Sequence, residues 1–177
     1  RGAKRFLLEV LQDNEPAMRA YQKAGFRVTR PFDCWEFAGP CGPPPVPVLG
    51  VRGAASARLD EFAAEQDWRP SWENSFEAIR RVPGSMRFLG AFDGDQCRGV
   101  LAYNPVLRWV MAVLVKRAHR RQGVGAALLG ALMGTLPTGG RPVRVNNVDP
   151  SDAGMRGLLQ QTGFRKFTAQ YEMEFLL

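Results

Sequence analysis

Histidine and cysteine are scarce in this chain of 177 residues, which contains one histidine and three cysteines. Cys34, Cys41 and Cys97 form an odd set without paired spacing, so neither a disulfide framework nor a zinc site of the usual kind is expected. No apolar run reaches the ~20 residues that a membrane span requires, and the first residues lack a signal-peptide core. We therefore expect a cytoplasmic protein with free thiols, no metal and no membrane partner.

Acidic residues are fewer than basic ones, 17 against 24, which gives a net charge of +7 and a pI near 9.9. This excess indicates an anionic partner: a nucleic acid, a membrane surface or a phosphorylated ligand. The basic residues are scattered apart from one cluster at 116–121, which favours a local anion site over a nucleic-acid track. A nucleic-acid function would also need a basic face with stacking aromatic residues.

A proline-rich stretch at 38–50 divides the chain, because it can form neither a helix interior nor a central strand. We therefore expect a front part at 1–37, a linker at 38–50 and a longer part at 51–177. In the front part, the pattern predicts a strand at 6–11, a helix at 15–24 and extended chain at 26–37.

The sequence pattern of the longer part, residues 51–177, predicts a mixed α/β (α+β) fold with a mostly antiparallel sheet. The turn Asp93-Gly94-Asp95 joins two strands into a hairpin, and a strand–helix–strand–helix unit follows it. Helices are expected at 56–65, 72–81, 122–136 and 151–161, and strands at 86–92, 97–103, 108–115, 143–148 and 164–175.

The front part and the end of the chain share a repeat. Gly25 and Gly163 are 138 positions apart, and both follow a helix and precede an extended segment. Six residues recur at this offset: Gln22, Gly25, Phe26, Arg27, Glu36 and Phe37 reappear as Gln160, Gly163, Phe164, Arg165, Glu174 and Phe175. The front part is therefore interpreted as the last third of a first domain, followed by a second domain.

An apolar strand at 110–115 runs into a basic, glycine-containing helix start at 120–126. Gly123 and Gly125 lack a Cβ, so phosphate oxygens can approach the main chain, where the free amides of a first helical turn donate to them. Arg120 and Arg121 add charge-assisted hydrogen bonds. This arrangement predicts a site for a pyrophosphate.

Two alternatives remain for the helix start. A dinucleotide site fits less well, since Leu128 stands where the third glycine belongs and no acidic strand end follows at the right distance. The other alternative is a solvated basic helix start without a ligand.

The stretch Arg120-Arg121-Gln122-Gly123-Val124-Gly125 resembles the acyl-coenzyme A motif of the GNAT superfamily of N-acetyltransferases, and the similarity extends over residues 46–177. The resemblance implies the GNAT fold, whose sheet splays between the fourth and fifth strands, and acetyl-CoA as the cofactor. It also implies transfer to a primary amine of a small molecule or peptide, and pairing with a second GNAT domain in cis or in a homodimer. The cofactor-binding residues that it implies are Val113, Leu114, Val115, Arg120, Arg121, Gln122, Gly123, Val124, Gly125 and Ala126.

In the family, a tyrosine in the last helix commonly protonates the departing thiolate. The front part carries that pattern, with Asn14 as the cofactor contact and Tyr21 as the catalytic acid, whereas the second repeat has Asp152 and Leu159 at these positions. Three possibilities stay open: the second domain transfers without a tyrosine acid, it binds cofactor but is inactive, or the first domain is the enzyme. Alternatively, Tyr21 is a core residue without a catalytic role. Tyr103 or Tyr171 could replace it as the acid, although the spacing of neither residue indicates this role.

The general base is not evident in the sequence. Glu73 and Glu77 lie one helical turn apart near Trp68 and Trp72, where they either hold a cationic amine or form a solvent-facing stripe. His119 precedes the motif arginines and is interpreted as a solvated loop residue. A non-catalytic acyl-CoA-binding module is therefore the alternative to an acyltransferase.

Overall fold

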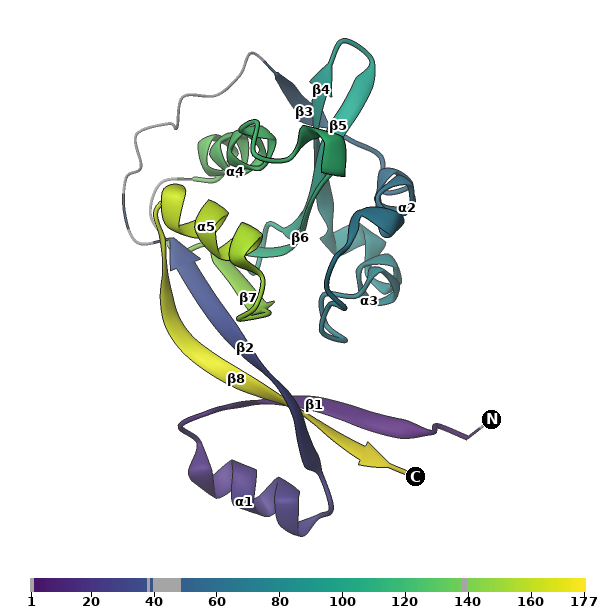
Figure 1. The fold of residues 1–177 in the computed structure, drawn as a ribbon, viewed down its shortest axis with the longest axis vertical. Coiled ribbons are helices and arrows are strands. Elements are labelled where there is room, and N and C mark those ends of the chain that lie inside the picture. Colours follow the sequence, from purple (N-terminus) through teal and green to yellow (C-terminus); the bar gives the residue numbers. More distant parts are fainter. Residues whose placement is uncertain (1, 38, 40–48, 138–139) are drawn as a thin grey trace.

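The chain forms an eight-stranded sheet with helices on both faces, in a computed structural model that describes residues 2–37, 39, 49–137 and 140–177 (Figure 1). The strands are β1 (Arg5–Leu11), β2 (Arg27–Phe37), β3 (Gly50–Gly53), β4 (Arg87–Asp93), β5 (Gln96–Asn104), β6 (Trp109–Val115), β7 (Arg144–Val148) and β8 (Phe164–Leu176). The helices are α1 (Glu15–Lys23), α2 (Arg58–Glu61), α3 (Phe76–Arg81), α4 (Val124–Thr135) and α5 (Ala153–Gln161), with 3₁₀ turns η1 (Ala63–Glu65), η2 (Pro83–Ser85) and η3 (Arg117–His119). Cys41 and the expected linker, apart from residues 39, 49 and 50, lie outside the described residues.

The strand order is β1-β8-β2-β7-β6-β5-β4-β3. All neighbouring strands are antiparallel except β6 and β7, which are parallel. This parallel pair is registered only at Trp109 with Arg144 and at Val110 with Val145. The sheet therefore opens between β6 and β7, the fourth and fifth strands of the GNAT fold that the resemblance implied, and the expected mixed, mostly antiparallel sheet is confirmed.

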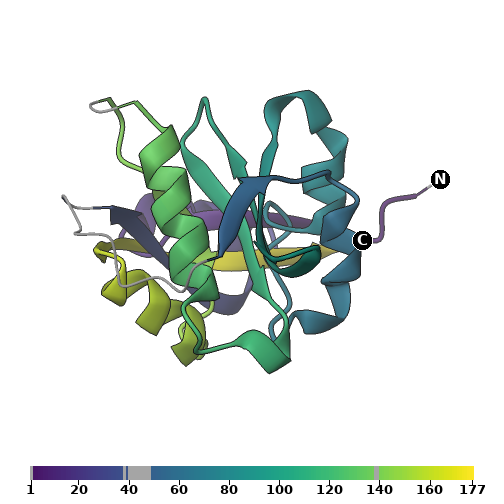
Figure 2. The ribbon, with the colours of Figure 1, turned by 90° about the horizontal axis from the view of Figure 1, so that it is seen from above.

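Helices α4 and α5 cover one face of the sheet, and α2 and α3 cover the other (Figure 2). Each face has its own hydrophobic core. Leu128, Leu132 and Leu159 belong to the α4–α5 core, whereas Phe62 and Ile79 belong to the α2–α3 core. All five side chains are at most 1% exposed, so the two cores fix both helix layers against the sheet.

The front segment is part of this same sheet. Strand β2 lies between β7 and β8, and β1 pairs with the outer side of β8 (Figure 1). Helix α1 lies beside this end of the sheet and contains no buried residue. The repeat is thus visible as two strand–helix–strand units, β1–α1–β2 and β7–α5–β8, whose strands interleave.

Equivalent residues of the two units make equivalent contacts. The ring centroids of Phe26 and Phe175 are 5.5 Å apart, as are those of Phe37 and Phe164. Both helices are also capped alike, since Asn14 accepts from the amide of Ala17 (3.2 Å) and Asp152 accepts from the amide of Met155 (2.8 Å).

Most predicted elements match the structure within two residues at each end. The two early helices differ: the segment 56–65 divides into α2 and η1, and α3 begins only at Phe76 because Ser75 caps it through the amide of Ala78 (3.1 Å). Strand β3 was not predicted. Among the described residues, no helix is long and apolar enough to cross a membrane, and no cluster of three metal-ligating side chains occurs.

Candidate active site

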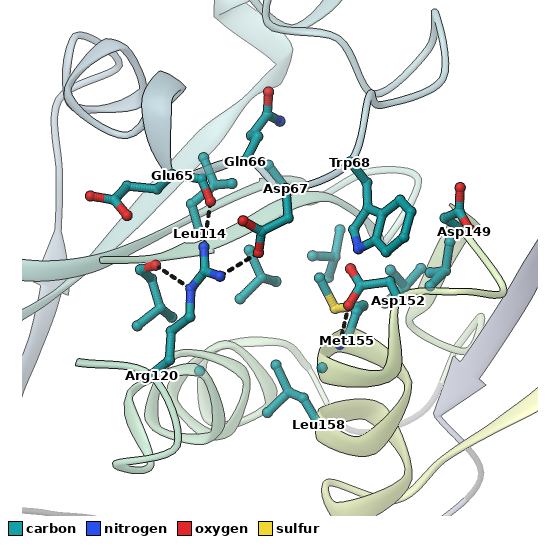
Figure 3. Close-up of a pocket in the computed structure, with 18 of the residues that line it drawn as sticks. Glu65, Gln66, Asp67, Trp68, Leu114, Arg120, Asp149, Asp152, Met155 and Leu158 are labelled. Atoms are coloured by element: carbon teal, nitrogen blue, oxygen red, sulfur yellow. Dashed lines mark hydrogen bonds and ion pairs between the residues drawn. The ribbon is translucent and has the colours of Figure 1, made fainter. Parts of the chain in front are cut away.

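A cavity of about 430 Å³ lies where β6 and β7 separate (Figure 3). Its walls come from β6, the start of α4, the first turns of α5 and the loop after η1. Because registered pairing with β7 stops at Val110, the cavity-facing main-chain groups of 111–115 have no partner from β7. An extended ligand with amide groups can therefore bind along β6 as a further strand would.

The start of α4 presents main-chain amides to this cavity. Gly123, the N-cap residue, has a φ of 80°, a left-handed conformation that favours glycine. The first helical hydrogen bond runs from the amide of Ala127 to the carbonyl of Gly123 (2.9 Å), so the amides of 124–126 lie ahead of it. Together with the helix dipole, these amides form a site suited to an anion.

Arg120 is held by the protein itself. Its guanidinium donates to the carbonyl of Val115 (3.2 Å), to the carbonyl of Glu65 and to the carboxylate of Asp67 (Figure 3). Arg117 also binds Asp67 (3.0 Å), and hydrogen bonds from the two arginines hold the pKa of Asp67 below its usual range. Arg120 therefore fixes the loop after η1 to the end of β6 rather than presenting a free charge.

Arg121 has the free charge that Arg120 lacks. It is exposed, has a φ of 61° and makes no hydrogen bond or ion pair within the described part of the chain. Its guanidinium lies beside α5, because a Cβ on Gly157 would be 3.9 Å from Nη1 of Arg121. Arg121 thus extends from the amide-rich start of α4 toward α5 at the rim of the cavity.

Two other motif residues have structural roles. A Cβ on Gly125 would approach Cδ2 of Leu158 to 2.8 Å, so this glycine permits close packing of α4 against α5. Gln122 donates to the carbonyl of Ala118 (3.0 Å) and is the one predicted cofactor residue that does not line the cavity. The other nine predicted residues all line it.

The loop at 65–74 forms a further wall of the cavity, where Trp68 and Asn74 line it. This loop is tied to the end of β7, since Nδ2 of Asn74 donates to the carbonyl of Asn146 (2.9 Å) and Nδ2 of Asn147 donates to Oγ of Ser71 (3.3 Å). The loop and β7 thus form one continuous wall.

The sequence profile of the acetyltransferase (GNAT) family matches residues 54–164. This match covers more than half of the chain, and the splayed strands and the glycine-containing helix start agree with it. The chain belongs to the GNAT family. No significantly similar sequence was found among curated proteins.

Solved GNAT structures share the fold at low sequence identity. A GCN5-related N-acetyltransferase from Sphaerobacter thermophilus is 19% identical, with a TM-score of 0.65, 98% of this chain covered and 60% of that one. A putative GNAT acetyltransferase from Novosphingobium aromaticivorans is 17% identical, with a TM-score of 0.66 and coverages of 98% and 75%. A tandem GNAT protein from the clavulanic acid biosynthesis pathway is 19% identical, with a TM-score of 0.62 and coverages of 98% and 64%. This chain therefore spans about 60% of the Sphaerobacter structure.

None of the three tyrosines of this GNAT chain lines the described cavity. Tyr21 lies on α1, away from the splay, and its ring packs against Phe26 with centroids 5.9 Å apart (Figure 1). Tyr103 is in the core beneath α4, and Tyr171 lies on β8. Leu159, the counterpart of Tyr21 in the repeat, is fully buried in the same core.

The two acidic residues considered for the acceptor region, Glu73 and Glu77, differ in their exposure to solvent. Glu77 is exposed, whereas Glu73 is half-buried, and burial raises the pKa of the Glu73 carboxyl. Trp72 turns away and donates to the carboxylate of Glu9 on β1, and His119 lines the cavity. Burial is the main cause that raises the pKa of Glu9 to about 7, and the nearby Glu73 and Glu172 carboxylates add to it.

Three residues that shape the site were not predicted from the sequence. Asp67 binds an arginine that is 53 positions away, and the carbonyl of Glu65 binds the same arginine from 55 positions away. Asn147 is 6% exposed at the end of β7, with a φ of 59°. The available signal for Asn147 was its repeat position, which corresponds to that of Glu9 on β1.

Proposed function

We propose that this GNAT protein transfers an acetyl group from acetyl-CoA to a primary amine of a small molecule or peptide. The observation that carries the proposal is the juxtaposition of the α4 amides, Arg121 and the unpaired edge of β6 around one cavity. The donor set fits the cofactor: free first-turn amides and a free guanidinium suit a pyrophosphate, and a strand edge suits an arm with amide groups.

Each part of the cavity has a role in this proposal. The amides of 124–126 and Arg121 bind the phosphates, and Val113, Leu114 and Val115 line the pantetheine arm. When bound, acetyl-CoA would supply a thioester whose carbonyl carbon forms a bond to the amine nitrogen as its bond to sulfur breaks, and the departing thiolate would take up the proton that the nitrogen loses. A β6 amide that faces the splay stabilises the carbonyl oxygen as negative charge develops there.

Calorimetric titration with acetyl-CoA, followed by a thiol-release assay against a panel of primary amines, tests the proposal. We expect saturable binding and amine-dependent thiol release. Arg121→Glu is expected to weaken binding about tenfold or more, since it replaces a charge-assisted donor with a repulsive charge. Arg81→Glu is the matched control, because Arg81 lies at the end of α3, outside the cavity. Absence of saturable binding would exclude the function.

The second candidate is an acyl-CoA-binding module without transfer activity. The specific observation in its favour is that the cavity has no lining tyrosine among the described residues. Saturable acetyl-CoA binding without thiol release for any amine supports this candidate, whereas turnover excludes it.

We further propose that residues 1–37 belong to the end of a first GNAT-type domain, whose Tyr21 serves a site of that domain, and that 51–177 form the second. The interleaved units support this. The first strand of the second unit, β7, pairs with β6, whereas the equivalent first strand of the other unit, β1, is an edge strand of the sheet. A strand and a helix equivalent to β6 and α4, in the same chain or in another subunit, would cover the outer edge of β1 in the same way. Phe6, which is 51% exposed, and Leu11, which is 39% exposed, both on β1, are apolar groups that such a pair would cover.

A further inference from the structure

Asn147 stands out among the residues that line the cavity because its carboxamide is only half satisfied. Its Nδ2 donates to Oγ of Ser71 (3.3 Å) and to Oε2 of Glu73 (3.4 Å). Its Oδ1 is buried and accepts no hydrogen bond from any described residue. Since an unsatisfied buried acceptor costs about 1–3 kcal/mol, an oxygen left in this state points to a missing donor.

The orientation of the carboxamide follows from its neighbours. Oγ of Ser71 and the carboxylate of Glu73 both accept from the amide nitrogen, which fixes the nitrogen on the side of the 65–74 loop. Ser71 is fully buried and Asn147 is 6% exposed, so the pair forms a rigid wall. The positive φ of Asn147 places this side chain at the end of β7, where β7 has already left β6.

The position of Oδ1 separates it from the phosphate site. The carboxamide is held by the 65–74 loop, which leads into α3. The phosphate site is the start of α4, and α4 covers the other face of the sheet (Figure 2). Asn147 is also the only cavity-lining residue with a buried, unpartnered acceptor among the residues that the structure describes. Because the carboxamide nitrogen faces the 65–74 loop, Oδ1 lies on the side of the carboxamide turned away from that loop.

We propose that Oδ1 of Asn147 accepts a hydrogen bond from the acceptor amine, and that Glu73 and Ser71 position the carboxamide for this contact. The inference rests on the proposed acetyl transfer and assigns the amine-binding wall of that same cavity. The substrate class is a primary amine that enters beside Trp68, whose ring lines the same wall and is 42% exposed. An amide oxygen is not a base at neutral pH, so Asn147 orients the nitrogen and does not take its proton.

The test compares amine use with cofactor binding in Asn147→Ala. Using n-butylamine, 2-phenylethylamine and a glycine-initiated tetrapeptide as probes, we expect a loss of about tenfold to a hundredfold in kcat/KM for the amine, mostly in KM. The acetyl-CoA Kd and the slow amine-independent hydrolysis of acetyl-CoA are expected to stay within about twofold of wild type.

Glu73 provides the test of positioning. We expect Glu73→Ala to raise KM for the amine, and Glu73→Gln to restore it because Oε1 of glutamine still accepts from Nδ2 of Asn147. Glu77→Ala is the matched control, since Glu77 is exposed on α3 and does not line the cavity. The thermal midpoint of each variant confirms that it is folded.

A spectroscopic measurement needs no turnover. In protein saturated with coenzyme A, titration with n-butylamine is expected to shift the side-chain NH₂ resonances of Asn147, because hydrogen bonding at Oδ1 polarises the whole carboxamide. A wild-type protein that fails to bind acetyl-CoA would refute the proposed function itself. Normal acetyl-CoA binding combined with unchanged amine kinetics in Asn147→Ala would refute only the role of Asn147. An acetyl-CoA Kd raised about tenfold in Asn147→Ala would likewise overturn it, since the oxygen would then serve the cofactor.

Discussion

Phe26 packs on Phe175 at the same 5.5 Å centroid distance at which Phe37 packs on Phe164. Within the repeat, Phe26 corresponds to Phe164 and Phe37 to Phe175. The two contacts therefore join equivalent positions of the two units. Phe26 and Phe37 of the first unit therefore each pack on a phenylalanine of the second. This equivalence supports the proposal that residues 1–37 are the end of a first GNAT-type domain, since they match the last strand–helix–strand unit of the second.

The two contacts are expected to differ in strength. Phe164 is 4% exposed within the main core, whereas Phe175 is half-buried near α1. We expect Phe164→Ala to lower the free energy of unfolding by about 3–4 kcal/mol and Phe175→Ala by about 1–2 kcal/mol. Urea unfolding followed by circular dichroism measures both. Equal losses would contradict the burial difference.

The two motif arginines are expected to have separable effects. Arg121→Ala should weaken acetyl-CoA binding about fivefold to tenfold and leave the thermal midpoint unchanged, because its guanidinium binds no described group. Arg120→Ala should lower the thermal midpoint by several degrees, since it removes contacts with Glu65, Asp67 and Val115. Calorimetry and thermal unfolding of both variants separate the roles, and the reverse assignment would contradict the geometry.

Glu9 is expected to make stability depend on pH. Its pKa is raised from 4.5 to about 7, chiefly by burial, so between these values the folded state binds more protons than the unfolded state. Stability should therefore fall as the pH rises from about 4.5 to 7 and level off above it. With the partial exposure of Glu9, the fall is about 1–2 kcal/mol. Glu9→Gln should remove this slope, and an unchanged slope would assign it to other groups.

The close contact of α4 with α5 predicts a cost for any side chain at position 125. Gly125→Ala should lower the free energy of unfolding by about 1–3 kcal/mol, because the new Cβ meets Leu158 at 2.8 Å. In the Leu158→Ala background the same substitution should cost much less, which a double-mutant cycle measures. Additive losses would show that Leu158 is not the obstacle.

Local sequence signals were sufficient for most of the fold. The Asp93-Gly94-Asp95 turn predicted the hairpin of β4 and β5, and apolar periodicity placed most helices and strands within two residues of their observed ends. Strand β3 has four residues, two of them glycine, and depends on pairing with β4, so it leaves no periodic pattern.

The site was predictable where it is continuous in sequence. The helix start at 120–126, which we propose as the phosphate site, could be predicted because its amides and glycines are adjacent in the sequence. The capture of Arg120 by Asp67 and the half-satisfied carboxamide of Asn147 depend on residues brought together from distant parts of the chain. No spacing rule applies to such contacts.

The insertion of β2 between β7 and β8 has a consequence for synthesis on the ribosome. Strands β1 and β2 find their strand partners only in residues 144–176, which are synthesised much later. Until then β1 and β2 are without the strand β8 that lies between them in the sheet, and their edges are open to other chains. The long sequence separation of these strand pairs is thus expected to slow the folding of this part of the sheet.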